Sequence, residues 1–105
     1  MYVVIRRYEG ARPLFDQLAK REQDVRELIT SVPGFVAYEL ARTNTGGFSV
    51  TTCQDKTGAD ESSRRAAEWI RLNITAEAIG DPPIVIEGES MFRWVNAAAL
   101  KAASV

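Results

Sequence analysis

The sequence contains no histidine, and this absence excludes more chemistry than any other feature of its composition. Histidine is the commonest protein ligand of metals and the side chain whose ordinary pKa lies nearest neutrality. Cys-His zinc sites, Ser-His-Asp triads and histidine-ligated haem therefore cannot be built from these 105 residues. Any general base has to be a carboxylate, lysine, tyrosine or cysteine whose pKa its surroundings shift. We expect no metal and no cofactor.

Cysteine, net charge and long apolar runs are scarce as well. The single cysteine, Cys53, cannot form an internal disulfide, and no secretory pattern opens the chain, so we expect a cytoplasmic protein. The 13 basic and 14 acidic side chains nearly cancel, which disfavours nucleic acid and anionic membranes as partners. The longest apolar runs fall far short of the roughly 20 residues that span a bilayer. The composition predicts a soluble protein.

Segments of strand and helix character alternate along the chain. The expected strands cover residues 2–8, 35–42, 48–54 and 84–94, with a loop of hairpin composition at 43–47. One amphipathic helix is expected over residues 11–32, and a second runs from a cap at Thr57 or Asp60 to about Ala78. Pro33 ends the first helix, and Gly34 frees the backbone to turn directly into the next strand.

This order predicts an α+β, ferredoxin-like β-α-β-β-α-β fold, with an antiparallel sheet and both helices on one face. Residues 1–94 are expected to form the single domain, and residues 95–105 an alanine-rich C-terminal tail. The other sheet face is semi-apolar in either register of the strands. Since exposed patches of several hundred Å² are uncommon on monomers, we predict a homodimer through this face.

Arg6 and Arg7 are adjacent in the first strand, so one side chain points to each face of the sheet. Because a buried arginine needs an acidic partner, a salt bridge to a neighbouring strand is the structural interpretation. The candidate partners are Glu39, Glu87 and Glu89. The functional interpretation is a clamp for an anionic carboxylate, enolate or quinone oxygen.

Three further side chains are candidates for a site. Tyr38 either donates its phenol to a substrate oxygen or packs its ring on the first helix. Trp69 lies at the edge of the second helix's apolar stripe, where it roofs a pocket or packs on the C-terminal segment. Cys53 is interpreted as a small hydrophobic residue, because no histidine can pair with it as a nucleophile.

The pattern Val32-Pro33-Gly34-Phe35 followed by Tyr38, the short hairpin, the next strand and the second helix is similar to a known family. It resembles the antibiotic-biosynthesis-monooxygenase-like branch of the dimeric α+β barrel superfamily, over nearly the whole chain. Residues 60–69 also resemble a group of uncharacterised small proteins in that branch. The resemblance implies two protomers packed sheet to sheet, each with a pocket between its sheet and its helices.

The resemblance also marks positions where this chain departs from its pattern. A tryptophan usually precedes an acidic residue at the end of the third strand, and here Gln54 precedes Asp55. The asparagine of the quinone-forming members falls near Val50, and that of the haem-degrading members near Arg7. The histidine of the haem-degrading members has no counterpart. These departures argue against haem degradation and weaken the case for oxygenation.

The leading hypothesis is a cofactor-independent monooxygenase that acts on a small aromatic or polyketide-like compound. Its expected ligand-binding residues are Arg7, Tyr38, Val50, Gln54 and Trp69, with Arg7 and Tyr38 as catalytic candidates. The alternative is a non-enzymatic small-ligand-binding or stress-response dimer, which the missing tryptophan and histidine favour. An isomerase or decarboxylase ranks last, because the only bases on offer are carboxylates and Tyr38.

Overall fold

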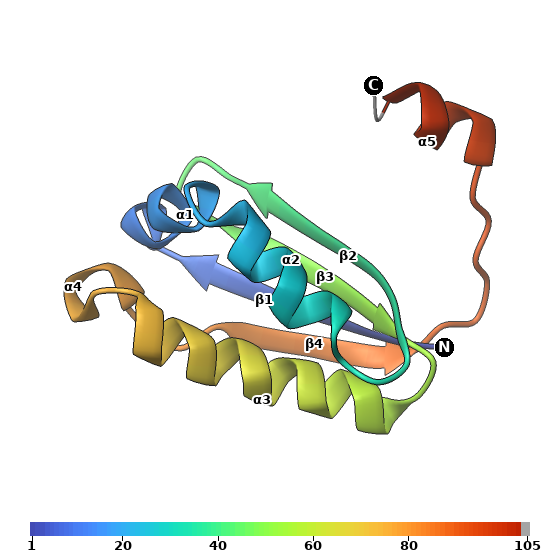
Figure 1. The fold of residues 1–105 in the computed structure, drawn as a ribbon, viewed down its shortest axis with the longest axis horizontal. Coiled ribbons are helices and arrows are strands. Elements are labelled where there is room, and N and C mark those ends of the chain that lie inside the picture. The colour runs from blue at the N-terminus through green and yellow to red at the C-terminus, as the bar shows by residue number, and fades with distance from the viewer. Residues whose placement is uncertain (104–105) are drawn as a thin grey trace.

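Four antiparallel strands form one sheet in the structure, a computed structural model that describes residues 1–103 (Figure 1). The strands are β1 (Tyr2–Glu9), β2 (Phe35–Arg42), β3 (Gly46–Cys53) and β4 (Ile84–Glu89). Their spatial order is β2-β3-β1-β4, so β1 and β3 are central. This is the ferredoxin-like architecture that the sequence predicts.

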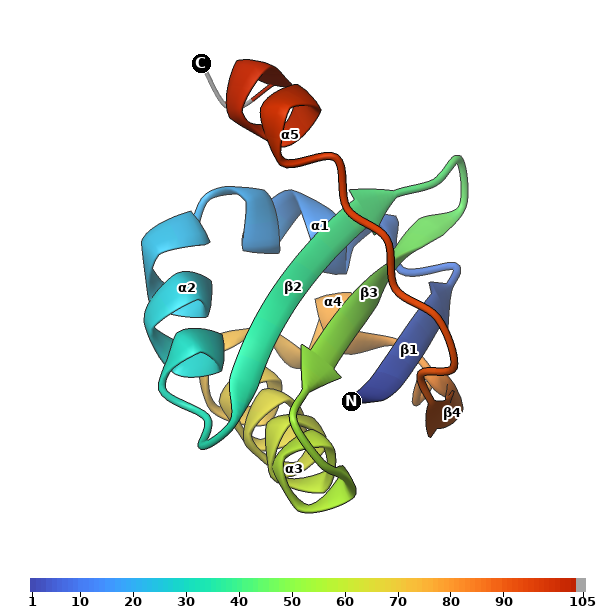
Figure 2. The ribbon, with the colours of Figure 1, turned by 90° about the vertical axis from the view of Figure 1, so that its right-hand side faces the viewer.

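The helices cover one face of this sheet, as the sequence also predicts. They are α1 (Arg12–Ala19), α2 (Glu22–Thr30), α3 (Lys56–Asn73) and α4 (Ala76–Ile79). In Figure 2, α1 and α4 lie behind the strands, α2 lies to the left of β2 and α3 lies below the strands, while α5 stands apart from the sheet. We call the face under the helices the covered face and the opposite face the open face. Within residues 1–103, no helix has the length and apolar character needed to cross a bilayer.

The predicted single helix over residues 11–32 is wrong, because the chain forms two helices separated at Lys20 and Arg21. The amide groups of these two residues bond to carbonyls only three positions back, at Gln17 and Leu18. The sequence has a gap in its apolar stripe at this point. The break lets α1 pack mainly on β3 and α2 on β2, which one straight helix would not do.

The second helix also differs from its predicted bounds. Asp55, and not Thr57 or Asp60, is its N-cap, because the Asp55 carboxylate accepts a bond from the Gly58 amide at 2.9 Å. The helix ends at Asn73, since Ile74 takes an extended conformation with φ −109° and ψ 142°. A short helix, α4, then leads to the last strand.

The last strand ends at Glu89, so the prediction that it runs to Trp94 is wrong. Its ladder to β1 closes with the pair Tyr2 and Glu89, and residues 91–94 have no neighbouring strand within residues 1–103. The predicted tail holds a further helix, α5 (Ala97–Ala103), which stands apart from the sheet in both views (Figures 1 and 2). Residues 104 and 105 of the predicted tail lie outside the described residues.

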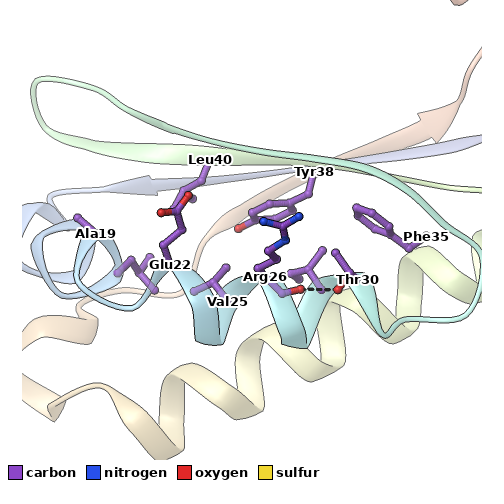
Figure 3. A pocket seen from close by; sticks show the side chains of 10 residues that line it. Ala19, Glu22, Val25, Arg26, Thr30, Phe35, Tyr38 and Leu40 are labelled. Carbon is purple, nitrogen blue, oxygen red and sulfur yellow. Dashed lines mark hydrogen bonds between the residues drawn. The ribbon is translucent and has the colours of Figure 1, made fainter. Parts of the chain in front are cut away.

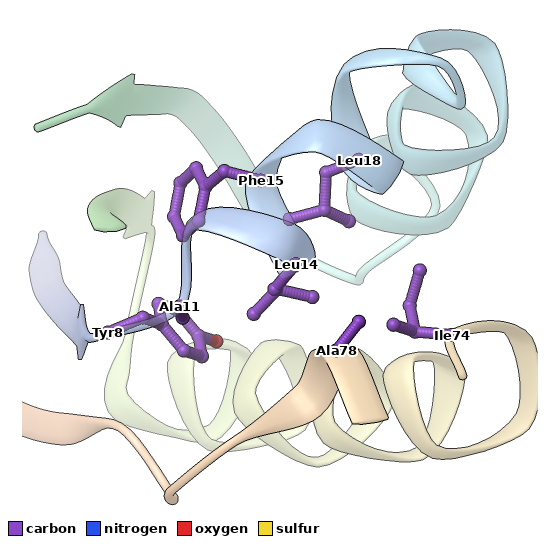
Figure 4. Packing of buried hydrophobic residues seen from close by; sticks show 7 residues of the cluster. All are labelled: Tyr8, Ala11, Leu14, Phe15, Leu18, Ile74 and Ala78. Carbon is purple, nitrogen blue, oxygen red and sulfur yellow. The ribbon is translucent and has the colours of Figure 1, made fainter. Parts of the chain in front are cut away.

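The main apolar core lies between the covered face, α1, the C-cap of α3 and α4 (Figure 4). Phe15 packs its ring edge-on against Tyr8, with 5.8 Å between ring centroids. Leu14 is fully buried beside them. Phe15 can lie this close to the sheet because Gly47 has no side chain: a Cβ there would stand 2.2 Å from the Phe15 ring. The core therefore fixes α1 against β3 and leaves α2 to frame a cavity.

Candidate functional site

A cavity of about 450 Å³ lies between β2 and the helices α1 and α2 (Figure 3). Its lining residues are Leu18, Ala19, Glu22, Val25, Arg26, Ile29, Thr30, Phe35, Tyr38 and Leu40. Figure 3 shows Tyr38 and Phe35 pointing from β2 toward α2, which presents Glu22 and Arg26. We call this space the Tyr38 cavity. It combines apolar walls with a phenol, a carboxylate and a guanidinium, as small-molecule sites commonly do.

A β-bulge explains why Phe35 and Tyr38 share this cavity. Residues three apart on a regular strand point to opposite faces. The pairing of β2 with β3 shifts between Phe35 and Ala37, and this extra residue returns Tyr38 to the face that Phe35 occupies. The irregularity in β2 therefore builds one wall of the cavity.

The Tyr38 phenol is held in its neutral form. Burial raises its pKa to about 12, with a smaller contribution from Tyr8, while the Arg6 cation acts in the opposite direction. The phenol makes no hydrogen bond to another residue within 1–103. At neutral pH it is thus a protonated donor without a protein acceptor.

Arg6 lies at the centre of the covered face, surrounded by hydroxyl groups. Its Nη1 donates to Thr51 Oγ1 at 3.0 Å and to Ser49 Oγ at 3.4 Å, both on β3. Its Nη2 donates to Ser62 Oγ at 2.8 Å and to Ser63 Oγ at 2.7 Å, both on α3. The side chain is nearly buried, since the residue is only 3% exposed. We call these four residues the hydroxyl cage.

The predicted salt bridge of a buried arginine is wrong for Arg6. No carboxylate within residues 1–103 forms an ion pair with it, and Glu87 instead accepts from Tyr2 and pairs with Lys56 at 3.6 Å. Burial lowers the pKa of Arg6, although an arginine remains charged at any ordinary pH. The Arg6 Nε is moreover buried without a hydrogen-bond partner. A desolvated cation thus faces only neutral acceptors.

Trp69 lies close to both Arg6 and Tyr38. All three line a narrow interior space of about 30 Å³ between α2, α3 and the sheet. The Arg21 guanidinium stands over the indole ring of Trp69, 5.1 Å from its centroid. Of the five residues expected to bind a ligand, the structure brings together Tyr38 and Trp69.

The other three expected residues lie elsewhere. Arg7 is on the open face, where its exposed side chain pairs with Glu9 at 3.3 Å. Val50 is also on the open face, opposite Ile5 of β1. Gln54 is exposed after the end of β3, and its backbone N–H donates to the Gly34 carbonyl at 2.8 Å. None of the three lines the Tyr38 cavity.

Glu22 and Arg26 were not among the residues predicted to form the site, and Arg7 was predicted to bind a ligand in place of Arg6. Helical spacing from Val25 and Ile29 identifies one side of α2 as apolar, and Glu22 and Arg26 border that side. Their position next to the apolar stripe is the signal in the sequence that identifies them. For the arginines, alternation shows only that the two point to opposite faces.

Two further kinds of functional group are relevant to this chain: a metal-binding cluster and a reactive cysteine. No cluster of three or more acidic or cysteine side chains that could hold a metal occurs in the described part of the chain. Cys53 is fully buried beneath α3, and burial raises the pKa of its thiol. This agrees with its interpretation as a small hydrophobic residue.

No protein-family model matches the sequence, and no curated protein matches it either. Solved structures do match. The NE2512 protein of unknown function from Nitrosomonas europaea has a TM-score of 0.71 and 16% identity, over 91% of this chain and 94% of its own.

Two matching structures are enzymes with ligands bound. The heme-degrader MhuD from Mycobacterium tuberculosis, with two hemes in its active site, has a TM-score of 0.65 and 17% identity, over 90% of this chain and 100% of its own. The monooxygenase ActVA-Orf6 of Streptomyces coelicolor, in complex with nanaomycin D, has a TM-score of 0.59 and 17% identity, over 91% and 90%. Likeness at such identities concerns architecture. The chain therefore shares the ferredoxin-like α+β fold of these solved structures, which is the fold that the sequence predicts.

Proposed function

We propose that the protein binds a small aromatic or polyketide-like compound beside Tyr38 and oxidises it as a cofactor-independent monooxygenase. The observation that carries this proposal is the Tyr38 cavity, whose phenol lacks a protein acceptor. The fold supports it, because ActVA-Orf6 is a monooxygenase that holds nanaomycin D. Because this proposal involves no cofactor, the substrate itself has to supply the electrons.

An anthrone serves as the test substrate for this chemistry. It loses a proton to form an enolate, which reduces dioxygen: one oxygen atom becomes the new carbonyl of the anthraquinone, and the other leaves as water. The neutral Tyr38 phenol donates a hydrogen bond to the enolate oxygen and so stabilises the developing charge. Glu22, on the same cavity, is the carboxylate that we assign as the base.

The test is an oxygen-electrode assay with anthrone as the substrate. We expect one dioxygen consumed for each anthraquinone formed, and a rate roughly 100-fold lower in Tyr38→Phe, as for the loss of an oxyanion donor. Tyr2→Phe is the matched control, because its phenol bonds to Glu87 outside the cavity. A wild-type rate no faster than autoxidation in buffer would overturn the oxygenase proposal, and an equal rate in both variants would overturn the role of Tyr38 in it.

A non-enzymatic ligand-binding protein is the second candidate function. The observation that favours it is Gln54, which stands where the family pattern has a tryptophan and lies outside the cavity. Calorimetry with anthraquinone separates the two candidates. Binding that Tyr38→Phe weakens, together with no oxygen uptake from anthrone, would support the non-enzymatic function over the enzyme.

We further propose that two copies pack through the open face. Ile84 and Ile86 on this face are 49% and 57% exposed, beside the partly buried Ile5 and Val50. Apolar surface of this extent is uncommon on a monomer. Sedimentation equilibrium should give twice the chain mass of 11.6 kDa. A monomeric mass at micromolar protein would contradict the proposal.

A further inference from the structure

We propose that Arg6 and Ser63 form a binding site for a small organic carboxylate with an apolar body, separate from the Tyr38 cavity. The inference starts from the donors of the Arg6 guanidinium. Its Nη groups donate to the four hydroxyls of the cage, and its Nε–H has no acceptor although it is buried. A buried charged donor without an acceptor is costly, and a bound anion would remove that cost.

The hydroxyl cage supplies a second donor. Ser62 accepts from Arg6 and gives its own proton to the Ala59 carbonyl at 2.6 Å. Ser63 also accepts from Arg6, but its own proton has no acceptor within residues 1–103. Arg6 Nε–H and Ser63 Oγ–H are therefore two donors available for the two oxygens of a carboxylate.

Both side chains line a cavity of about 260 Å³ between α3, β1 and β4. Its other lining residues are Tyr8, Ala67, Ile70, Pro83 and Val85. No acidic side chain is among them, so nothing in the lining repels an anion or neutralises the guanidinium. Val85 is 46% exposed, which places the cavity at the surface, where a ligand can enter.

The chemistry of the lining defines the ligand class. The polar groups of the lining are the Arg6 guanidinium, the Ser63 hydroxyl and the Tyr8 phenol, and the remaining lining residues are apolar. Such a site selects a compact molecule with one carboxylate and an apolar ring or branched chain. The proposal does not depend on oxygenation, because the residues of this cavity are not those of the Tyr38 cavity.

The experiment compares benzoate with benzamide, which has the same shape and no charge. Each is titrated into the protein while NMR follows the Nε–H signal of Arg6 and the ring signals of Tyr38. We expect benzoate to shift the Arg6 signal and to bind about tenfold or more tightly than benzamide, a difference of about 1.4 kcal/mol. The Tyr38 ring signals show separately whether the compound also binds in the Tyr38 cavity.

Variants test the two donors. Ser63→Ala should weaken benzoate binding about threefold to tenfold, in the range of a single lost hydrogen bond. Arg6→Lys, which keeps the charge but loses the Nε–H, should weaken it further, and Arg7→Lys on the open face should leave it unchanged. If Arg6→Lys does not fold, the benzoate affinity of Ser63→Ala still tests the site.

Three results would overturn the carboxylate site. One is an Arg6 Nε–H signal that benzoate does not move, and another is equal affinity for benzoate and benzamide. The third is a Ser63→Ala variant that binds benzoate as the wild type does. None of these results bears on the oxygenase proposal, which the anthrone assay tests independently.

Discussion

The two faces of the sheet differ in where they place charged and apolar residues. On the covered face, Arg6 is 3% exposed and bonds only to neutral hydroxyls, whereas on the open face Arg7 is in solvent beside Glu9. The open face carries instead the exposed Ile84 and Ile86. Stability alone would favour the reverse arrangement, with charge in water and isoleucine under the helices. Each face therefore departs from the stable pattern at the place where we propose an interaction.

The largest expected effect tests whether the covered face holds the fold by itself. Leu14→Ala should lower the free energy of unfolding by about 2–5 kcal/mol, because it leaves a cavity in the core. Leu72→Ala, at a residue that is 64% exposed, should change it by less than about 0.5 kcal/mol. Urea unfolding measures both. Equal losses would mean that the core does not lie where the structure puts it.

The next effect tests the open face. Ile86→Lys should weaken the proposed dimer more than tenfold, or by at least about 1.4 kcal/mol, since it places a charge in an apolar interface. Sedimentation velocity across a dilution series measures the dissociation constant. Leu72→Lys on α3 is the control, with a similar exposure to Ile86. An unchanged dissociation constant in Ile86→Lys would move the interface away from this face.

Replacing the two arginines, one on each face, should have a smaller effect on the free energy of unfolding. Arg6→Met should keep the free energy of unfolding within about 1 kcal/mol or raise it, because an apolar side chain relieves an uncompensated buried charge. Arg7→Met should change it by less than about 0.5 kcal/mol, since Arg7 is exposed. If Arg6→Met instead costs more than about 3 kcal/mol, Arg6 is a structural residue.

The last effect, which appears only at alkaline pH, concerns the ionisation of Tyr38. Its folded pKa of about 12 lies above the ordinary value of 10.0, so the unfolded chain loses this proton first as the pH rises. The contribution of the neutral phenol to stability is therefore complete below pH 10 and is lost between pH 10 and about 12. A tyrosinate absorbance titration should show a component near pH 12 that Tyr38→Phe removes. A titration unchanged by this variant would contradict the burial of Tyr38.

The fold was predictable because several local signals agree with one topology. Pro33 and Gly34, the turn residues of the hairpin and the apolar periodicities all indicate the same order of elements. The helix break at Lys20 and Arg21 was not predictable from these signals. It depends on two helices packing on different strands, which is a property of the tertiary structure.

The candidate site was predictable only in part. Val4 and Ile5 are equally apolar, so the alternation in β1 does not reveal whether Arg6 or Arg7 lies under the helices. The bulge before Tyr38 leaves no clear signal in the sequence, although it brings Phe35 into the same cavity. Gln54 was aligned to a family position, and the end of β3 carries it into solvent. The identity of each site residue thus depended on register, which composition and periodicity do not fix.

The placement of the two tryptophans gives the protein two intrinsic fluorescent reporters. Trp69 is half-buried beside the interior space, with Arg21 over its ring, while Trp94 is 87% exposed and stacks on Phe92 with 5.5 Å between centroids. Emission from an indole in water lies at longer wavelength than emission from a shielded one. A Trp94→Phe chain would report on the cavities, and a Trp69→Phe chain on the segment that follows β4. Ligand binding at the cavities can therefore be followed optically apart from changes in the segment that follows β4, without an attached dye.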